Sequence, residues 1–79
     1  MEDSLKELRE KKLLSQRDVI NLMGTRNKDK ISLLENGKIH LEFSEAVKLS
    51  SIFGVTLEEL FQAYRNSKKE NGKDLKIAP

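Results

Sequence analysis

The sequence predicts an all-α fold, and two observations lead to this prediction. Its apolar residues recur at separations of three or four positions rather than two, which is the period of a helix. One proline and four glycines in 79 residues leave few positions that would interrupt helices. A chain of this length forms one small domain with a single thin core, and a two-domain enzyme is excluded.

Two helices are predicted near the N-terminus. Residues 4–12 form the first, because Leu5 and Leu8 lie at helical spacing and acidic residues precede basic ones, as the helix dipole favours. Ser15 begins the second, because its hydroxyl can cap the helix while Asp18 takes the place of the glutamate of a capping box. The residues expected to face the core from this second helix are Val19, Ile20 and Met23.

A third helix is predicted after a short polar turn. Gly24 is expected to end the second helix in the left-handed conformation, and the third runs from about residue 28 to 35. Two short helices joined by a turn of about four residues that starts with glycine are typical of a helix-turn-helix, whose second helix enters the major groove of DNA. Corners of this kind also occur in many other helical bundles. The residues expected to face inward from the third helix are Ile31 and Leu34.

Two more helices and a tail complete the predicted chain. Residues 43–53 form the fourth helix, which Gly54 ends, and Thr56 to Glu59 is a capping box that begins the fifth. The side chains expected to pack from these two helices are Phe43, Val47, Leu49, either Ser50 or Ala46, Phe53, Leu60, Phe61 and Tyr64. The sequence then becomes polar without apolar periodicity, which predicts a domain of residues 1–64 and a basic tail of residues 65–79 that is flexible or orders only against a partner.

The charges of the chain are unevenly distributed. The formal net charge is only +2, but residues 9–38 carry eight basic and four acidic side chains, whereas residues 39–64 carry one basic and four acidic ones. Such an asymmetry is compatible with ordinary solvated helix faces and also with a polyanionic partner. It favours nucleic acid only in combination with the helix-turn-helix spacing.

Several classes of function find no support in the residues. The absence of cysteine excludes disulfides and cysteine zinc sites, and a single histidine, His40, cannot complete a metal site. No glycine-rich phosphate loop is present, and the adjacent Glu58 and Glu59 face different sides of a helix. No apolar run approaches the ~18 residues of a membrane span. We therefore expect a cytoplasmic protein that is not an enzyme and has no cofactor, metal or membrane contact.

Several motifs in the correct order resemble the phage-repressor family, also called the xenobiotic-response-element or Cro/lambda-repressor-type helix-turn-helix family. They are Leu5–Arg9, Leu14–Gln16, Gly24, Ile31–Ser32, Glu35–Lys38, Leu49 and Phe53–Phe61. The resemblance covers residues 5–61 and implies a five-helix lambda-repressor-like domain whose second and third helices form the helix-turn-helix. It also implies a pairing of Arg9 with Glu35. Members of this family are mostly dimeric bacterial or phage regulators that bind operators.

The chain departs from the family pattern in two places. One extra residue lies between Gly24 and Ile31, and Ile20 occupies a position where the family generally has alanine. The bulky Ile20 side chain is expected to push the second and third helices apart. A longer turn is what that wider separation needs.

The resemblance and the helical phase together predict which residues contact DNA. Counting back from Ile31, the side chains expected to face bases are Lys28, Asp29, Ser32 and Leu33. Lysine can donate to guanine, aspartate can accept from cytosine N4, and leucine can contact the thymine methyl. Asp29 could instead only stabilise the N-terminus of the helix by interacting with the helix dipole. The side chains expected at the DNA backbone are Gln16, as the resemblance implies, and Arg17, Arg26, Asn27, Lys30, Asn36 and Lys38. Lys30 could equally be a solvated charge.

The predicted function is a sequence-specific transcriptional regulator, and specifically a repressor. It would bind double-stranded DNA as a homodimer on a pseudo-palindromic operator, with half-sites about one helical turn (~34 Å) apart. The residues expected at the dimer interface are Phe61 and Tyr64, with the tail residues Leu75 to Ile77 as a further candidate. The alternative is an antitoxin-like or adaptor module that contacts another protein through the fifth helix or the tail. A tail that binds nucleic acid only by its charge is a third interpretation.

Overall fold

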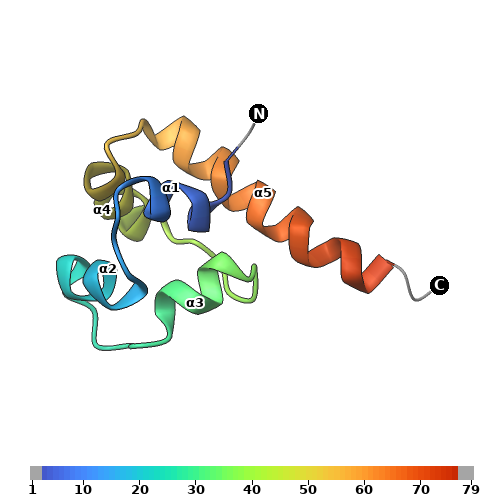
Figure 1. Cartoon of the computed structure of the whole chain (residues 1–79), viewed down its shortest axis with the longest axis horizontal. Coiled ribbons are helices and arrows are strands. Elements are labelled where there is room, and N and C mark those ends of the chain that lie inside the picture. The colour runs from blue at the N-terminus through green and yellow to red at the C-terminus, as the bar shows by residue number, and fades with distance from the viewer. Residues whose placement is uncertain (1–2, 77–79) are drawn as a thin grey trace.

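The computed structural model describes residues 3–76 of the chain, which fold into five α-helices and no strand (Figure 1). The helices are α1 (Leu5–Lys11), α2 (Gln16–Met23), α3 (Lys30–Glu35), α4 (Phe43–Phe53) and α5 (Leu57–Lys76). The predicted all-α, five-helix fold is confirmed. No helix in this part of the chain is both long enough and apolar enough to cross a bilayer.

The predicted capping boxes form as reciprocal hydrogen bonds. The Asp18 main-chain nitrogen donates to Ser15 Oγ over 3.0 Å, and the Ser15 nitrogen donates to Asp18 Oδ2 over 2.9 Å. Thr56 and Glu59 make the same exchange at the start of α5, over 3.0 and 2.8 Å. Each box satisfies main-chain N–H groups that have no partner within the helix. The hydrogen bonds from the Ser15 main chain and side chain also lower the pKa of Asp18.

Two glycines act at helix ends for different reasons. Gly24 ends α2 at φ 71°, as predicted, in a conformation that side chains with a Cβ rarely adopt. Gly37 follows α3 at φ 65°, and a Cβ there would lie 3.0 Å from Cα of Lys68, so the end of α3 packs directly against the main chain of α5. Leu13, between α1 and α2, has φ 57° although it is not glycine, and its side chain is exposed.

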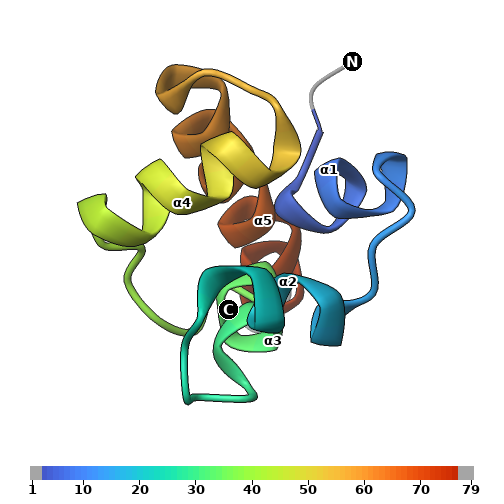
Figure 2. The same cartoon turned by 90° about the vertical axis from the view of Figure 1, so that its left-hand side faces the viewer.

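The core surrounds the first half of α5, with α1, α3 and α4 packed around it (Figure 2). Its largest fully buried apolar side chains are Val19, Leu34, Leu41, Leu49 and Leu60. The predicted packing of Phe43 and Val47 is wrong, because 65% and 44% of these residues is exposed. The predicted Leu49 and Phe53 do face inward, and Ala46 completes the inward face of α4.

The predicted boundary at residue 64 falls inside α5. The helix continues to Lys76, and Asn66 and Ser67 are buried although they are polar. Ser67 Oγ accepts a hydrogen bond from the Leu5 nitrogen and donates one to the Ala63 carbonyl, each over 3.0 Å. The expectation of a tail from residue 65 that is flexible or orders only against a partner is therefore corrected for this turn, because hydrogen bonds of Asn66 and Ser67 fix it against Asp3 and Leu5. Two tail residues were also predicted at a dimer interface. Ile77 lies outside the residues that the structure describes, and the side chain of Leu75 is not among those described.

We expect Ser67→Ala to destabilise the domain by about 1–3 kcal/mol. The substitution leaves the buried Leu5 N–H without its acceptor, and an unsatisfied buried donor has a cost of this size. Urea unfolding monitored by circular dichroism measures the change. Ser51→Ala is the matched control, since Ser51 is an exposed helical serine whose replacement should be nearly neutral. Equal stabilities of the two variants would contradict a structural role of the region after residue 64.

Candidate nucleic-acid interface

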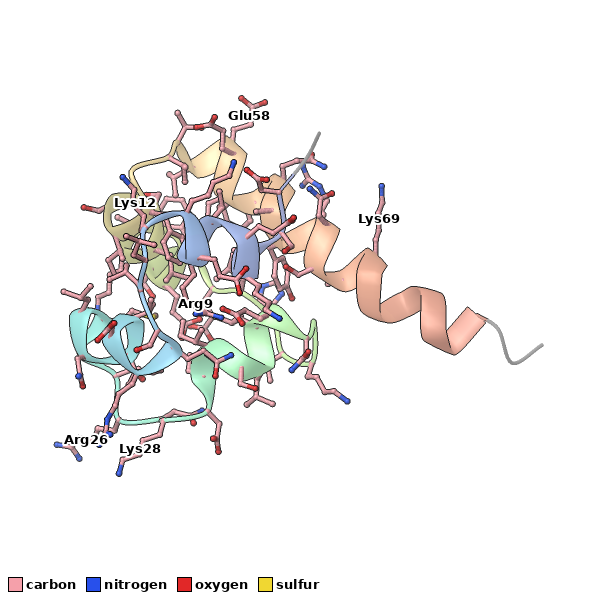
Figure 3. All side chains as sticks on the ribbon, in the orientation of Figure 1. Arg9, Lys12, Arg26, Lys28, Glu58 and Lys69 are labelled. Carbon is pink, nitrogen blue, oxygen red and sulfur yellow. The ribbon has the colours of Figure 1, made fainter. Side chains whose placement is uncertain are left out.

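The turn between α2 and α3 is polar and exposed. Arg26 and Lys28 extend from it into solvent at the end of the molecule opposite Glu58 (Figure 3). No described residue forms an ion pair with either side chain. Asn27 and Asp29, also exposed, lie in the same turn. The structure thus brings four of the predicted DNA-contacting residues together in one loop.

Hydrogen bonds accepted by Asn27 within this turn make α3 begin later than predicted. The Asp29 main-chain nitrogen donates to Asn27 Oδ1 over 3.0 Å, and the Lys30 main-chain nitrogen donates to the Asn27 carbonyl over 3.1 Å. Asn27 therefore closes a local turn in place of a first helical turn. The predicted start at residue 28 is corrected to Lys30, and Lys28 precedes the helix. Asp29 is the N-cap residue, but its side chain makes no capping hydrogen bond.

The orientation of α3 agrees with the predicted inward face. Ile31 and Leu34 are buried, while Ser32 and Leu33 are half-buried on the remaining surface of the helix. Asn36 and Lys38 follow the C-terminal end of α3 and are exposed. The side-chain Nδ2 of Asn36 donates to the Ser32 carbonyl over 2.9 Å.

The Glu35 carboxylate connects α3 to both preceding helices, through an ion pair with α1 and a hydrogen bond from α2. Arg9 Nε lies 2.6 Å from Glu35 Oε2, and only 10% and 6% of the two side chains is exposed. The pairing implied by the resemblance is therefore confirmed. Arg9 Nη1 also donates to the Leu14 carbonyl over 2.8 Å, and Gln16 Nε2 donates to Glu35 Oε1 over 2.9 Å. Gln16 is exposed at the start of α2, with its side-chain amide oriented by Glu35.

Lys30 does not extend into solvent with the other basic side chains. Its Nζ lies 2.6 Å from Oε2 of Glu45 on α4, with 19% of the lysine and 17% of the glutamate side chain exposed. The expectation that Lys30 is a solvated charge is therefore corrected, and a contact of Lys30 with the DNA backbone would require its ammonium group to leave Glu45. Nothing in the local sequence indicates this partner, because the two residues are fifteen positions apart.

The residues predicted at a dimer interface lie against the core. Tyr64 is buried, its hydroxyl donates to the Ile39 carbonyl over 2.7 Å, and Lys68 Nζ lies 5.4 Å from the centre of its ring. The expectation of Tyr64 at an interface is wrong, because the hydroxyl allows the ring to pack inside the fold. Phe61 is half-buried and packs against the core. Sequence reasoning missed the large apolar side chains that are exposed, and these are Leu13, Leu22, Phe43 and Val47.

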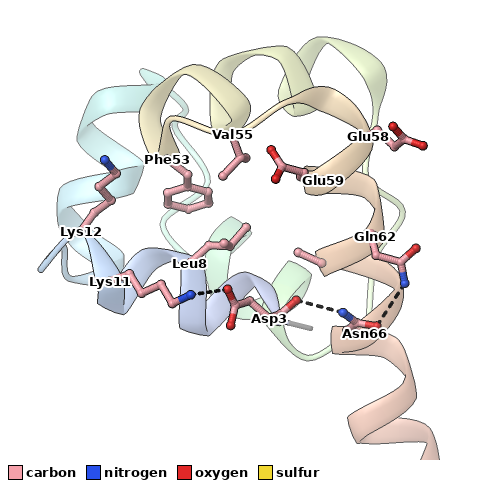
Figure 4. A pocket seen from close by; sticks show the side chains of 11 residues that line it. Asp3, Leu8, Lys11, Lys12, Phe53, Val55, Glu58, Glu59, Gln62 and Asn66 are labelled. Atoms are coloured by element: carbon pink, nitrogen blue, oxygen red, sulfur yellow. Dashed lines mark hydrogen bonds and ion pairs between the residues drawn. The ribbon is translucent and has the colours of Figure 1, made fainter. Parts of the chain in front are cut away.

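A second surface feature lies between α1 and α5, away from the α2–α3 turn. It is an open hollow of about 730 Å³ whose apolar lining consists of Leu8, Phe53, Val55 and Ala63 (Figure 4). Lys11, the last residue of α1, and the C-cap residue Lys12 border it on one side, and Glu58 and Glu59 border it on α5. Helical periodicity could not predict this hollow, because it depends on the angle between two helices. No cluster of potential metal ligands occurs among the described residues, and His40 is exposed.

Comparison with known proteins gives one match. A family model described as a helix-turn-helix domain matches residues 4–65, from the N-cap of α1 into α5. No curated protein and no solved structure matches the chain.

We expect Glu35→Gln to destabilise the domain by about 3–5 kcal/mol, because it leaves the Arg9 guanidinium buried without its counter-charge. The double variant Arg9→Met with Glu35→Met removes both charges and should lose less stability than Glu35→Gln alone. Chemical unfolding of the two variants gives the comparison, with the exposed Glu58→Gln as a control. A Glu35→Gln protein as stable as that control would contradict the role of the pair.

Proposed function

The chain belongs to the helix-turn-helix domain family, and from this premise we propose that it is a sequence-specific DNA-binding regulator acting as a repressor in the cytoplasm. The observation that carries the proposal is the exposed turn between α2 and α3, where Arg26 and Lys28 have no ion-pair partner among the described residues. Free cations at this position can approach phosphates and base edges without losing an existing ion pair. The proposed activity is binding rather than catalysis.

Base recognition is assigned to the turn and to the outer side of α3. Lys28 can donate to the O6 or N7 atom of guanine. The Asp29 carboxylate makes no capping hydrogen bond, so it is available to accept from cytosine N4. Ser32 can form hydrogen bonds with more than one kind of base, and Leu33 can contact a thymine methyl group. These four residues keep their predicted roles, although Lys28 and Asp29 would act from the turn.

Contacts to the DNA backbone are assigned to the exposed residues around the two helices. The Gln16 amide has two N–H bonds, so one can remain on Glu35 while the other donates to a phosphate. The other proposed backbone contacts are Arg17, Arg26, Asn27, Asn36 and Lys38, all of them exposed. Lys30 has no place in this set, because its ammonium group is paired with Glu45.

We further propose that two copies bind a pseudo-palindrome, since one domain of this size makes too few contacts for tight binding to a half-site. Because Tyr64 is buried and Phe61 packs against the core, we assign the dimer surface to Phe43 and Val47, which lie one turn apart on α4 and are exposed. Exposed apolar side chains of this size commonly mark sites of association.

Phe43→Ser is accordingly expected to weaken the dimer, because it removes the largest exposed apolar side chain of this surface. Sedimentation equilibrium measures the dimer affinity, and cooperative occupancy of the two half-sites should decrease in parallel. Leu22→Ser, at an exposed position on α2, is the matched control. Equal dimer affinities of the two variants would place the interface elsewhere.

The alternative function is a partner-protein module, and the hollow beside α5 is the observation that favours it. Its apolar lining and charged borders are suited to a segment of another protein. Such a module would have little or no affinity for DNA. A partner bound there would also leave the α2–α3 turn exposed.

Salt-dependent DNA binding distinguishes these functions. Selection of bound duplexes from a random pool should recover a palindromic sequence. On that sequence we expect Lys28→Ala and Lys38→Ala each to weaken binding and to lower the slope of log affinity against log salt concentration by about 1. Lys69→Ala is the matched control, because Lys69 is exposed on α5 far from Lys28 (Figure 3). Loss of binding in Lys69→Ala alone would support the charged-tail interpretation, and salt-independent or absent binding would support the partner-protein module.

A further inference from the structure

The charges at the two ends of α3 oppose its helix dipole. Lys30 is its first residue and Glu35 its last, whereas a helix favours acids at its N-terminus and bases at its C-terminus. α1 follows the usual order, with Glu7 in its first turn and Arg9 and Lys11 in its last. α3 has only six residues, and a helix of this length does not form by propensity alone. Groups on other helices must therefore stabilise it.

Each of these charges meets an opposite charge from another helix. Glu35 pairs with Arg9 of α1, and Lys30 pairs with Glu45 of α4, both over 2.6 Å. The second pair lies at the end of α3 that follows the turn. Because most of both side chains is out of solvent, screening weakens this pair less than an exposed one.

The carboxylate of Glu45 is itself fixed in place. Its Oε1 accepts a hydrogen bond from the Glu42 nitrogen over 3.3 Å, so the group is part of the N-terminus of α4. α4 is joined in turn to the end of α2, where Lys48 Nζ donates to the Met23 carbonyl over 3.2 Å. The beginning of α3 is therefore connected through α4 to the helix that precedes the turn.

The turn has few other means of directing α3. Residues 26–29 are all exposed, so no buried side chain from them holds the start of the helix. The N-cap Asp29 adds no side-chain capping bond. Lys30 is the first residue after the turn whose side chain contacts the body of the domain through an ion pair.

We propose that Lys30 and Glu45 are positioning residues that set the direction of α3 and thereby the choice of bases, without contacting DNA themselves. This inference rests on the proposed DNA-binding function. The ion pair holds the N-terminal end of α3, which is the end that presents Lys28 and Asp29. A shift of this end moves the base-facing residues while leaving the phosphate-contacting cations outside the turn, Arg17 and Lys38, in place.

The effect of Glu45 separates this role from simple electrostatics. If Lys30 and Glu45 acted only through charge, removal of Glu45 would make the surface more positive and strengthen DNA binding. If they position α3, removal of either residue weakens specific binding. Glu45→Gln is a conservative test, because the glutamine oxygen can still accept from the Glu42 nitrogen.

The experiment measures affinity for the selected sequence and for random duplex over a range of salt concentrations. We expect Lys30→Met and Glu45→Gln each to lower specific affinity about tenfold, a size typical of coupling between contacting residues, and to leave random-duplex affinity and the salt slope unchanged. The double variant, Lys30→Met with Glu45→Gln, should lose little more specific affinity than either single variant, because each single substitution already breaks the pair. Lys28→Met and Glu58→Gln are the matched controls with unpaired charges, and Lys28→Met should change the salt slope.

Two results would overturn the proposal. A lower salt slope in Lys30→Met together with tighter binding of Glu45→Gln would make Lys30 a phosphate contact. Additive losses of specific affinity in the two single variants and their double variant would show that the two side chains do not act as a pair. Backbone amide chemical shifts of α3 provide a second readout that needs no DNA, since both single variants should shift the same α3 resonances and the double variant should shift them little further. If the unmodified protein binds no DNA, the proposed function fails, and these shifts alone decide whether the pair positions α3.

Discussion

The arrangement of α1, α2 and α3 depends on the buried ion pair between Arg9 and Glu35. Three nitrogens of the Arg9 guanidinium are used, two by Glu35 and one by the Leu14 carbonyl. This extent of hydrogen bonding is what makes the burial of a charged pair tolerable in a domain with a thin core. It also fixes the Gln16 amide through the shared carboxylate. Helix packing and orientation of a proposed DNA contact are thus consequences of one interaction.

Local chemistry explains why much of the fold could be predicted from the sequence. Ser15 with Asp18 and Thr56 with Glu59 form their capping boxes because both partners lie within one helical turn. The bounds of α4 agree with the prediction because Gly54 ends the helix at positive φ. The Arg9 pair was available only through the resemblance, since 26 positions separate its partners. The turn residues of the candidate site were identified correctly as exposed, but their roles in DNA binding remain predictions.

The predictions that failed required knowledge of tertiary contacts. Asn27 shifts the start of α3 through a side-chain hydrogen bond that competes with helix formation, and Lys30 pairs with Glu45 of α4, fifteen positions further along the chain. Tyr64 is buried because its hydroxyl finds the Ile39 carbonyl. The continuation of α5 has the same origin, because Ser67 is buried by hydrogen bonding and leaves no apolar periodicity to detect. Polar residues whose hydrogen bonds are satisfied inside a small domain cannot be told from surface residues in the sequence.

The length of α5 has a practical consequence for handling the protein. Beyond Lys69 the helix extends away from the other four helices, in a direction that increases its distance from the α2–α3 turn (Figure 1). Helical residues each add about 1.5 Å, so the last turns act as a built-in spacer. A fluorophore or an immobilisation tag carried at this end would stand clear of the turn. Optical or surface-based titrations could then be carried out with little steric interference from the attached group.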